Sequence, residues 1–341
     1  LRRLDILQTL IEDSSITEIM INGPDHIFVE KRGRMEEVPI QFSSEEKLLQ
    51  IIQRIVGDCN RTVNEVSPIV DARLQNGSRV NVVLSPIALN GPIVTIRKFP
   101  DCPLTIDQLI SWGSITKEAA EELRLYVQAG YNIFVSGGTG SGKTTFLNIL
   151  SDFIPKDERI ITIEDSAELQ IQGIENLIRL ETRNENVEGC HAITIRDLIK
   201  SSLRMRPDRI IVGEVRGSEA VDMITAFNTG HDGSMSTGHA NSARDMLSRL
   251  ENMILMGMDI PLAAVKQQIA SAIDIMIHLG RIRDKSRRVL EITEIDGIQD
   301  GEIKMHTLYE FTEDASPRIG ILQKKGQLQH VEKLKAAGLM L

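Results

Sequence analysis

The sequence predicts an α/β protein in which a small α+β module precedes a larger domain with a parallel sheet. Three observations support this prediction. The 341 residues exceed the size of one usual hydrophobic core, which favours two domains. Short strand-like runs dominate residues 1–99, whereas buried strands alternate with helices further along. A glycine-rich phosphate-binding motif follows one of those buried strands. We place the module at residues 1–99, a linker at 100–115 and the larger domain at 116–341.

The module contains predicted strands and one predicted helix. The helix covers residues 44–56 and begins at Ser43 or Ser44, which are favourable caps. Turn residues separate the strands, and two prolines in residues 100–103 predict the linker. The chain opens on Leu1 rather than Met, so we expect a longer natural chain. The predicted strands are 16–22, 26–31, 69–74, 79–84 and 93–99.

The larger domain alternates predicted helices with strands that are almost wholly apolar. Such strands are typical of a parallel sheet with helices on both faces. After Asp274 the pattern changes to β-rich segments, which predict an antiparallel extension at 274–281, 288–295 and 303–311. The strands predicted for the parallel sheet are 132–136, 160–164, 177–181, 209–214 and 233–237.

The phosphate-binding motif has the spacing of a P-loop: Gly, four residues, Gly, Lys and Thr. Glycines allow successive backbone N–H groups to converge on phosphate oxygens at the positive end of the following helix. Lys143 is expected to reach the β- and γ-phosphates, and Thr144 to offer its hydroxyl to Mg²⁺. The motif therefore predicts binding of ATP with Mg²⁺ by Gly137, Gly138, Thr139, Gly140, Ser141, Gly142, Lys143, Thr144 and Thr145.

Hydrolysis also needs a carboxylate near the metal and a group that orients water. The predicted hydrophobic strand 209–214 ends in Glu214, which occupies the Walker B position. Gly213 stands where an aspartate often binds Mg²⁺, so we expect Glu214 to contact the metal through water. The alternative is a solvated glutamate at a strand end.

A second buried strand ends at Glu164, followed by Asp165 and Glu168. Carboxylates at the carboxyl ends of parallel strands point into the crevice where such sheets bind ligands. Glu164 is therefore our candidate to polarise the attacking water. The alternative is an acid near a helix start without a catalytic role.

The predicted strand 233–237 ends in a polar cluster that contains His239. A histidine in this position is suited to sensing the γ-phosphate and signalling to neighbouring arginines. The alternative is a structural histidine. Zinc is not expected, because His231 and His239 lack cysteine or carboxylate partners at ligand spacing.

Charge and cysteine usage exclude other classes of function. The formal net charge is −9 and no basic stripe is present, so direct binding to nucleic acid is disfavoured. Cys59, Cys102 and Cys190 are far apart and form no metal spacing, so no metal cluster is expected. No apolar run approaches the length of a membrane span.

Four motifs together resemble the ATPases of type II secretion, type IV secretion and type IV pilus machines. The P-loop is the first motif. The Asp box at 162–165, the Walker B segment at 212–216 and the His box at 238–242 follow in order. In this family Glu164 matches the catalytic acid of the Asp box. Gly238 departs from the family, which usually carries a bulkier residue before the histidine.

Segments outside these motifs resemble the CpaF/TadA branch, the motors of tight-adherence (Tad) pili. They include residues 71–74, 77–84, 87–92 and 95–99 of the module and 202–208 and 228–234 of the larger domain. The resemblance covers approximately residues 13–311.

The resemblance implies a PAS-like N-terminal module, a RecA-like ATPase domain and a homohexameric ring that binds ATP between the two. It also implies a place at the cytoplasmic face of the inner membrane, beside a platform protein. The family uses arginines of the module against ATP phosphates, which identifies Arg73, Arg79 and Arg97 as candidates. Arg204 and Arg216 flank Walker B and are candidates to link His239 to the subunit boundary. Surface salt bridges are the alternative for each arginine.

The function predicted from the sequence is an ATP-hydrolysing motor for pilus assembly, pilus retraction or protein secretion. One alternative is a type IV secretion ATPase that transfers DNA–protein complexes. Another is an assembly platform that binds ATP and turns it over little, although a platform needs neither Glu164 nor Glu214.

Overall fold

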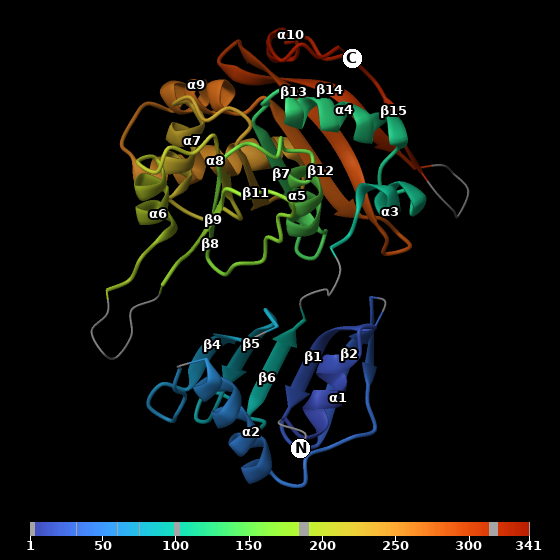
Figure 1. Ribbon diagram of the computed structural model, residues 1–341, viewed down its shortest axis with the longest axis vertical. Helices are drawn as coiled ribbons and strands as arrows, with labels where there is room; N and C mark the ends of the chain where they lie inside the picture. The colour runs from blue at the N-terminus through green and yellow to red at the C-terminus, as the bar shows by residue number, and fades with distance from the viewer. Residues whose placement is uncertain are drawn as a thin grey trace. The chain divides into compact units, whose positions relative to one another are not determined.

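The computed structural model describes residues 4–31, 33–59, 61–74, 76–98, 103–183, 191–313 and 320–340. The chain divides into two compact units, Leu1–Cys102 and Pro103–Leu341. Each unit has its own sheet, as Figure 1 shows. Residue 99 of the last predicted module strand, residues 100–102 of the predicted linker, and Cys190 lie outside the described residues.

The first unit is a six-stranded antiparallel sheet in the order β3-β2-β1-β6-β5-β4. Its predicted strands are observed within one residue of their predicted ends over the described residues. Its elements are α1 (Ile6–Glu12), β1 (Ile16–Asn22), β2 (His26–Lys31), β3 (Arg34–Glu37), α2 (Glu45–Asp58), β4 (Ile69–Arg73), β5 (Arg79–Val83) and β6 (Ile93–Arg97).

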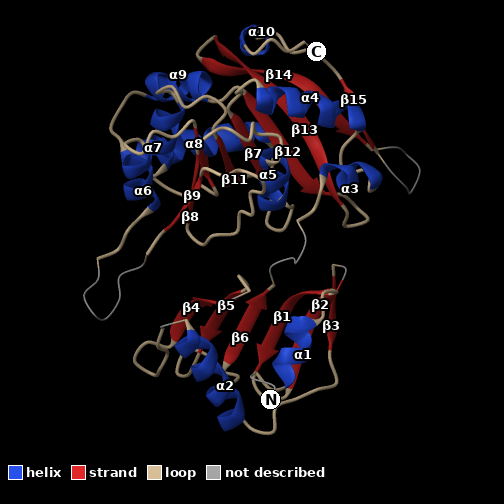
Figure 2. Cartoon of the chain, in the orientation of Figure 1, coloured by secondary structure: helices blue, strands red, loops and turns tan. Residues whose placement is uncertain are grey.

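Both helices of the first unit cover the same face of its sheet (Figure 2). Alternate strand residues such as Ile19, Val82 and Ile96 are fully or almost fully buried against them. The Ser44 side chain caps α2 by accepting from the N–H of Lys47. Helix α1 and strand β3 were not predicted, because α1 lacks a side-chain cap and β3 buries no side chain. The result is the predicted α+β module.

The second unit is a nine-stranded sheet in the order β15-β14-β13-β12-β7-β11-β10-β8-β9. The strands from β12 to β9 in this order pair in parallel, and those from β12 to β15 pair antiparallel. The antiparallel extension therefore continues the parallel sheet. The strands are β7 (Ile133–Gly137), β8 (Ile160–Glu164), β9 (Leu177–Glu181), β10 (Arg209–Val212), β11 (Met235–His239), β12 (Ile275–Arg281), β13 (Arg287–Gln299), β14 (Glu302–Thr312) and β15 (Ile321–Lys324).

Helices cover both faces of this sheet, as predicted (Figure 2). Ile133 and Val135 of β7 belong to a buried cluster with residues of α3, α4, α5 and α10, whereas Phe134 belongs to a second cluster with residues of α6 to α9. No helix of the described residues is long and apolar enough to cross a membrane. The helices are α3 (Ile106–Ser111), α4 (Lys117–Gln128), α5 (Lys143–Ser151), α6 (Ile195–Ser202), α7 (Ala220–Phe227), α8 (Ala243–Gly257), α9 (Leu262–Ala272) and α10 (Glu332–Ala336).

Several elements of the second unit differ from the predicted boundaries: β11 begins and ends two residues later than the predicted strand 233–237, and β13 extends beyond the predicted 288–295. Residues 106–115, which we expected in the linker, contain α3 and contribute Leu109 and Ile115 to the buried core. Strand β10 ends at Val212 rather than at Glu214, because the chain then turns and the N–H of Val215 donates to Thr237 of β11. Glu214 therefore lies on a loop, at the end of the sheet where the P-loop begins.

Candidate active site

The P-loop joins β7 to α5, because Gly137 ends the strand and Lys143 begins the helix. Gly140 and Gly142 have φ values of 68° and 96°, a left-handed backbone conformation that residues other than glycine rarely adopt. The Lys143 side chain is buried and its Nζ donates to the carbonyls of Gly137 and Gly138, both at 3.2 Å. The lysine is thus held over the loop, at the positive end of α5.

The loop residues fit a bound nucleoside triphosphate. The Oγ of Ser141 is buried and has no hydrogen-bond partner among the described residues. A Cβ on Gly137 would lie 2.5 Å from the carbonyl oxygen of Leu279 and 2.6 Å from Ser141 Oγ, so only glycine fits there. A glycine cradle, a spare hydroxyl and a buried cation together match the chemistry of a phosphate.

Four polar residues form a continuous chain beside the P-loop. Lys143 Nζ lies 3.2 Å from His239 Nδ1, and His239 Nε2 lies 2.7 Å from Glu214 Oε1. Arg216 Nη2 donates to Glu214 Oε2 at 2.6 Å. Because the ammonium of Lys143 can only donate, Nδ1 accepts and the imidazole proton is assigned to Nε2, the nitrogen in contact with Glu214.

The pKa of His239 is lowered, chiefly by burial and further by the positive charges of Lys143 and Arg216, although Glu214 opposes the shift. The imidazole is therefore neutral at neutral pH, which agrees with its position between a donor and an acceptor. Gly238 is the position that departs from the family. It lies within β11, where it pairs with Ser136 of β7, and a Cβ at this position would lie 2.8 Å from Met246 Sδ. Gly238 therefore lies in a regular strand, where a larger side chain would meet Met246.

Glu164 ends β8 and is 3% exposed. Its Oε1 accepts from the N–H groups of Glu168 and Leu169 at 2.8 and 2.9 Å, whereas its Oε2 is buried without a partner among the described residues. Burial raises the pKa of this carboxyl from 4.5 to about 7, although the two N–H groups lower it. A carboxyl with a pKa near neutrality is suited to proton transfer.

Gly213 leaves the space that Glu164 fills. A Cβ on Gly213 would lie 2.9 Å from Glu164 Cγ and 3.4 Å from its Oε1. On the other side, Thr237 Oγ1 donates to the carbonyl of Gly213 at 2.7 Å. The aspartate found at this position in the commoner Walker B form would therefore collide with Glu164. The buried position of Glu164 therefore requires a glycine, and not an aspartate, at position 213.

The three candidate arginines of the first unit, Arg73, Arg79 and Arg97, stand in one row. Arg79 of β5 is the register partner of both Arg73 of β4 and Arg97 of β6. Their neighbours Val80 and Ile96 are buried under the helices, so the row lies on the opposite face of the sheet. Arg97 is paired in turn with Glu18 of β1.

Arg216 and Arg204 have different surroundings. Besides its bond to Glu214, Arg216 places Nη1 3.8 Å from Asp165, and its side chain is 61% exposed. Arg204 does not join this cluster. It is exposed on the turn that precedes the N-terminal end of β10, whereas Glu214 follows the C-terminal end.

His278 is a residue beside the site that the sequence analysis missed. It is buried on β12, and its Nδ1 lies 2.9 Å from the Oγ of Ser136, the residue before the P-loop. A backbone hydrogen bond with Asn241 connects it to the loop after His239. The only sequence signal was its place in the otherwise apolar run 275–279, all of which is buried.

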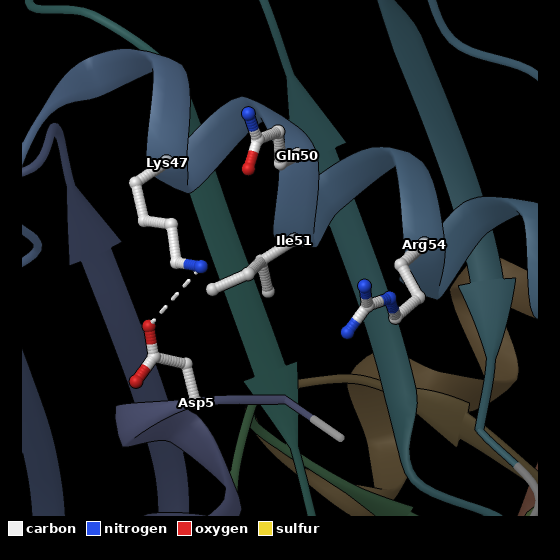
Figure 3. Close-up of a pocket in the computed structure, with 5 residues that line it drawn as sticks. All are labelled: Asp5, Lys47, Gln50, Ile51 and Arg54. Carbon is white, nitrogen blue, oxygen red and sulfur yellow. Dashed lines mark ion pairs between the residues drawn. The ribbon is translucent and has the colours of Figure 1, made fainter. Parts of the chain in front are cut away.

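A cavity of about 210 Å³ lies elsewhere, in the first unit (Figure 3). It is lined by Asp5, Lys47, Gln50, Ile51 and Arg54. Lys47 and Asp5 form an ion pair of 3.8 Å across it, with both side chains more than 40% exposed. An exposed pair of this kind contributes little to stability. None of the sequence motifs contributes to this cavity.

A P-loop at the carboxyl end of a parallel sheet, preceded by an α+β module, defines a P-loop nucleotide-binding protein with a RecA-like domain. Residues 2–327 match the protein family described as "Type II/IV secretion system protein". The chain belongs to this family.

Individual relatives agree with this membership. A putative conjugal transfer protein of Mycobacterium tuberculosis is 35% identical over 293 residues, which cover 84% of this chain and 83% of that protein. The type IV secretion system protein PtlH of Bordetella pertussis is 33% identical over 324 residues, covering 86% and 95%. The X-ray structure of the Legionella pneumophila ATPase DotB is similar in fold, with a TM-score of 0.61 at 22% identity over 85% of this chain and 80% of that one.

The raised pKa of Glu164 predicts a pH-dependent cost of folding. Below pH 4.5 the carboxyl is neutral in both states, and as pH rises to about 7 the unfolded state ionises first. Between about pH 4.5 and pH 8 the free energy of unfolding of the nucleotide-free parent should therefore fall by up to about 3 kcal/mol relative to that of Glu164→Gln. Urea unfolding at the two pH values measures this difference. The exposed neighbour variant Asp165→Asn is the control, and a constant gap between parent and Glu164→Gln would contradict the prediction.

Gly213→Ala should displace Glu164 and thereby impair catalysis more than folding. Overpacking costs about 1–3 kcal/mol, whereas a misplaced catalytic group can slow turnover by roughly 100-fold. Steady-state ATPase assays and ATP binding separate these effects, since affinity for ATP should stay near the parent value. Gly57→Ala, which meets no atom within 4 Å on α2, is the matched control. Parent-like turnover of Gly213→Ala would refute the proposed packing.

Proposed function

We propose that this chain is an ATP hydrolase that powers a machine of the type II/IV secretion superfamily. The observation that carries the proposal is the polar chain from Lys143 through His239 and Glu214 to Arg216, set against the P-loop. It joins a phosphate-binding lysine to a carboxylate and an exposed arginine. Such a chain can report the state of a bound phosphate to the surface of the subunit.

Glu164 is the proposed general base. Its partly satisfied carboxyl and raised pKa allow it to accept a proton from the attacking water near neutral pH. The backbone N–H groups of Glu168 and Leu169 hold the other oxygen, which keeps the carboxyl oriented. Proton transfer therefore needs no rearrangement of the β8 end.

Mg²⁺ would neutralise charge that develops on the phosphates. Thr144, at the start of α5, would offer its hydroxyl, and Glu214 would act through water. Glu214 is already shared between His239 and Arg216, which leaves it better placed to orient a water than to bind the ion directly.

We further propose that the protein works as a homohexamer. In this arrangement the row of Arg73, Arg79 and Arg97 meets the nucleotide when the two units, or two subunits, close around it. Planar guanidinium groups donate in a fork that suits phosphate oxygens. Arg204 and Arg216 would then lie towards subunit boundaries.

The process that is driven is proposed from kinship. The names of PtlH and of the mycobacterial relative favour a type IV secretion or conjugal transfer system. A Tad pilus motor is the second candidate, supported by the segments of the module that resemble that branch. In either system the partner would be a platform protein of the inner membrane, with the ATPase on its cytoplasmic side. An ATP-binding platform with little turnover is the remaining alternative, and measured turnover decides against or for it.

Lys143→Ala should abolish most nucleotide binding, because the buried charge disappears while the glycine cradle stays. Hydrogen bonds from charged groups of this kind contribute about 1.5–3 kcal/mol, which is roughly ten- to a hundredfold in affinity. Isothermal titration with ATP and phosphate-release assays measure binding and turnover. Lys117→Ala removes a 78% exposed lysine and is the control. Unchanged affinity in Lys143→Ala, or no hydrolysis by the parent, would overturn the proposed function.

Mixed rings test whether an arginine of the first unit acts on a neighbouring subunit. Arg97→Ala and Glu164→Gln should each be nearly inactive alone, since an arginine finger contributes about 10³- to 10⁵-fold in related chemistry. If Arg97 acts in trans, mixed oligomers contain sites with an intact Arg97 and an intact Glu164, and activity returns. Native mass spectrometry verifies the mixing. Verified mixing without recovery would mean that Arg97 acts in cis or is structural.

A further inference from the structure

Two arginines that the sequence analysis did not select contact the P-loop. Arg281 ends β12 and Arg287 begins β13, and the two are register partners at the end of this hairpin. The Nε of Arg281 donates to the carbonyl of Gly140 at 3.1 Å, and the Nε of Arg287 donates to the same oxygen at 2.9 Å. The hairpin therefore places two guanidinium groups on the phosphate-binding loop.

The glycines of the loop make room for these side chains. A Cβ on Gly140 would lie 2.7 Å from Arg281 Nη2, and a Cβ on Gly142 would lie 3.5 Å from Arg287 Cδ. Both arginines are exposed, so burial does not force them against the loop. Each arginine instead contacts the loop backbone through a hydrogen bond from its Nε to the carbonyl of Gly140.

Electrostatics favour an anion at this place. The two guanidinium groups and the ammonium of Lys143 all donate to carbonyls of the same short glycine loop. Their positive charges therefore repel one another. Among the described residues Arg281 has no ion pair that would offset this repulsion. Once Nε is bonded to Gly140, the Nη groups of Arg281 are the donors that remain for a phosphate.

The order of the sheet indicates which part of a nucleotide these arginines meet. Strand β12 lies on one side of β7, whereas β11, β10 and β8 lie on the other. His239, Glu214 and Glu164 follow from the latter three strands, on the side where the γ-phosphate would react. The hairpin approaches the loop from the opposite side, so it lies nearer the phosphates that ATP and ADP share.

We propose that Arg281 and Arg287 bind the α- and β-phosphates of ATP and ADP within their own chain. This inference rests on the proposed nucleotide site and adds two residues to it. Because their anchor, Gly140, belongs to the same unit, they act before any closure of units or subunits. They contribute to ground-state affinity, in contrast to the turnover role proposed for Arg97.

The test compares Arg281→Ala, Arg287→Ala and the double variant with Arg283→Ala. Arg283 lies in the same hairpin, is 92% exposed and pairs with Glu313 at 3.3 Å, so it is a matched control. Isothermal titration should show affinities for both ADP and ATP weakened by roughly tenfold for each single variant and unchanged for the control. The turnover number of the Arg283→Ala control at saturating ATP should stay within about twofold of the parent.

Thermal melts separate nucleotide binding from a structural brace on the loop. Without nucleotide the variants should melt like the parent, and with ADP their gain in melting temperature should be smaller. Arg281→Lys, which keeps the charge but loses the fork, should recover part of the affinity. Parent-like affinity in all variants, a loss confined to ATP, or lowered stability without nucleotide at equal affinity would each overturn the inference. A parent that binds no ADP would instead refute the nucleotide site itself.

Discussion

The parallel backbone ladder around β7 is the constraint on which the candidate site depends. It pairs His239 with Gly137 on β7 and aligns Ile163 with Val212 one residue before Glu164 and Gly213. Side chains that are far apart in sequence, such as Glu164 and His239, therefore end at one edge of the sheet. A shift of one residue in any of these pairs would turn a candidate site residue to the other face. The buried cores on both faces hold the register.

Glu164 illustrates how this edge combines folding with chemistry. Its carboxyl is buried, which is unfavourable for the ionised form, yet two backbone N–H groups from the following loop hold one oxygen in place. Gly213 supplies the room on the neighbouring strand. The site thus gives up the aspartate of the commoner Walker B motif and obtains a carboxyl whose pKa lies where proton transfer at neutral pH is efficient.

Arginines are divided between two tasks in the proposed mechanism. Arg281 and Arg287 are anchored on the P-loop of their own unit, where they favour binding of either nucleotide. Arg73, Arg79 and Arg97 belong to the other unit, so their contribution depends on closure. Binding and turnover are then controlled by different parts of the chain, which is the division a motor needs if nucleotide is to drive relative movement.

The sequence by itself determined the features that arise from local interactions. The predicted strands 16–22, 26–31, 160–164 and 177–181 coincide with β1, β2, β8 and β9, because their apolar patterns are unambiguous over a few residues. The P-loop was recognisable because its glycines and Lys143 act through the backbone of a single turn. The family membership followed from four such local motifs in order.

Only the tertiary structure decided which distant residues meet. The short strand β3 and helix α1 carry weak local signals and form through their neighbours. The contact of Gly213 with Glu164, the chain from Lys143 to Arg216 and the placement of Arg281 on Gly140 all depend on strand order. Strand order is set by packing and by pairings between remote segments, and no window of neighbouring residues contains that information.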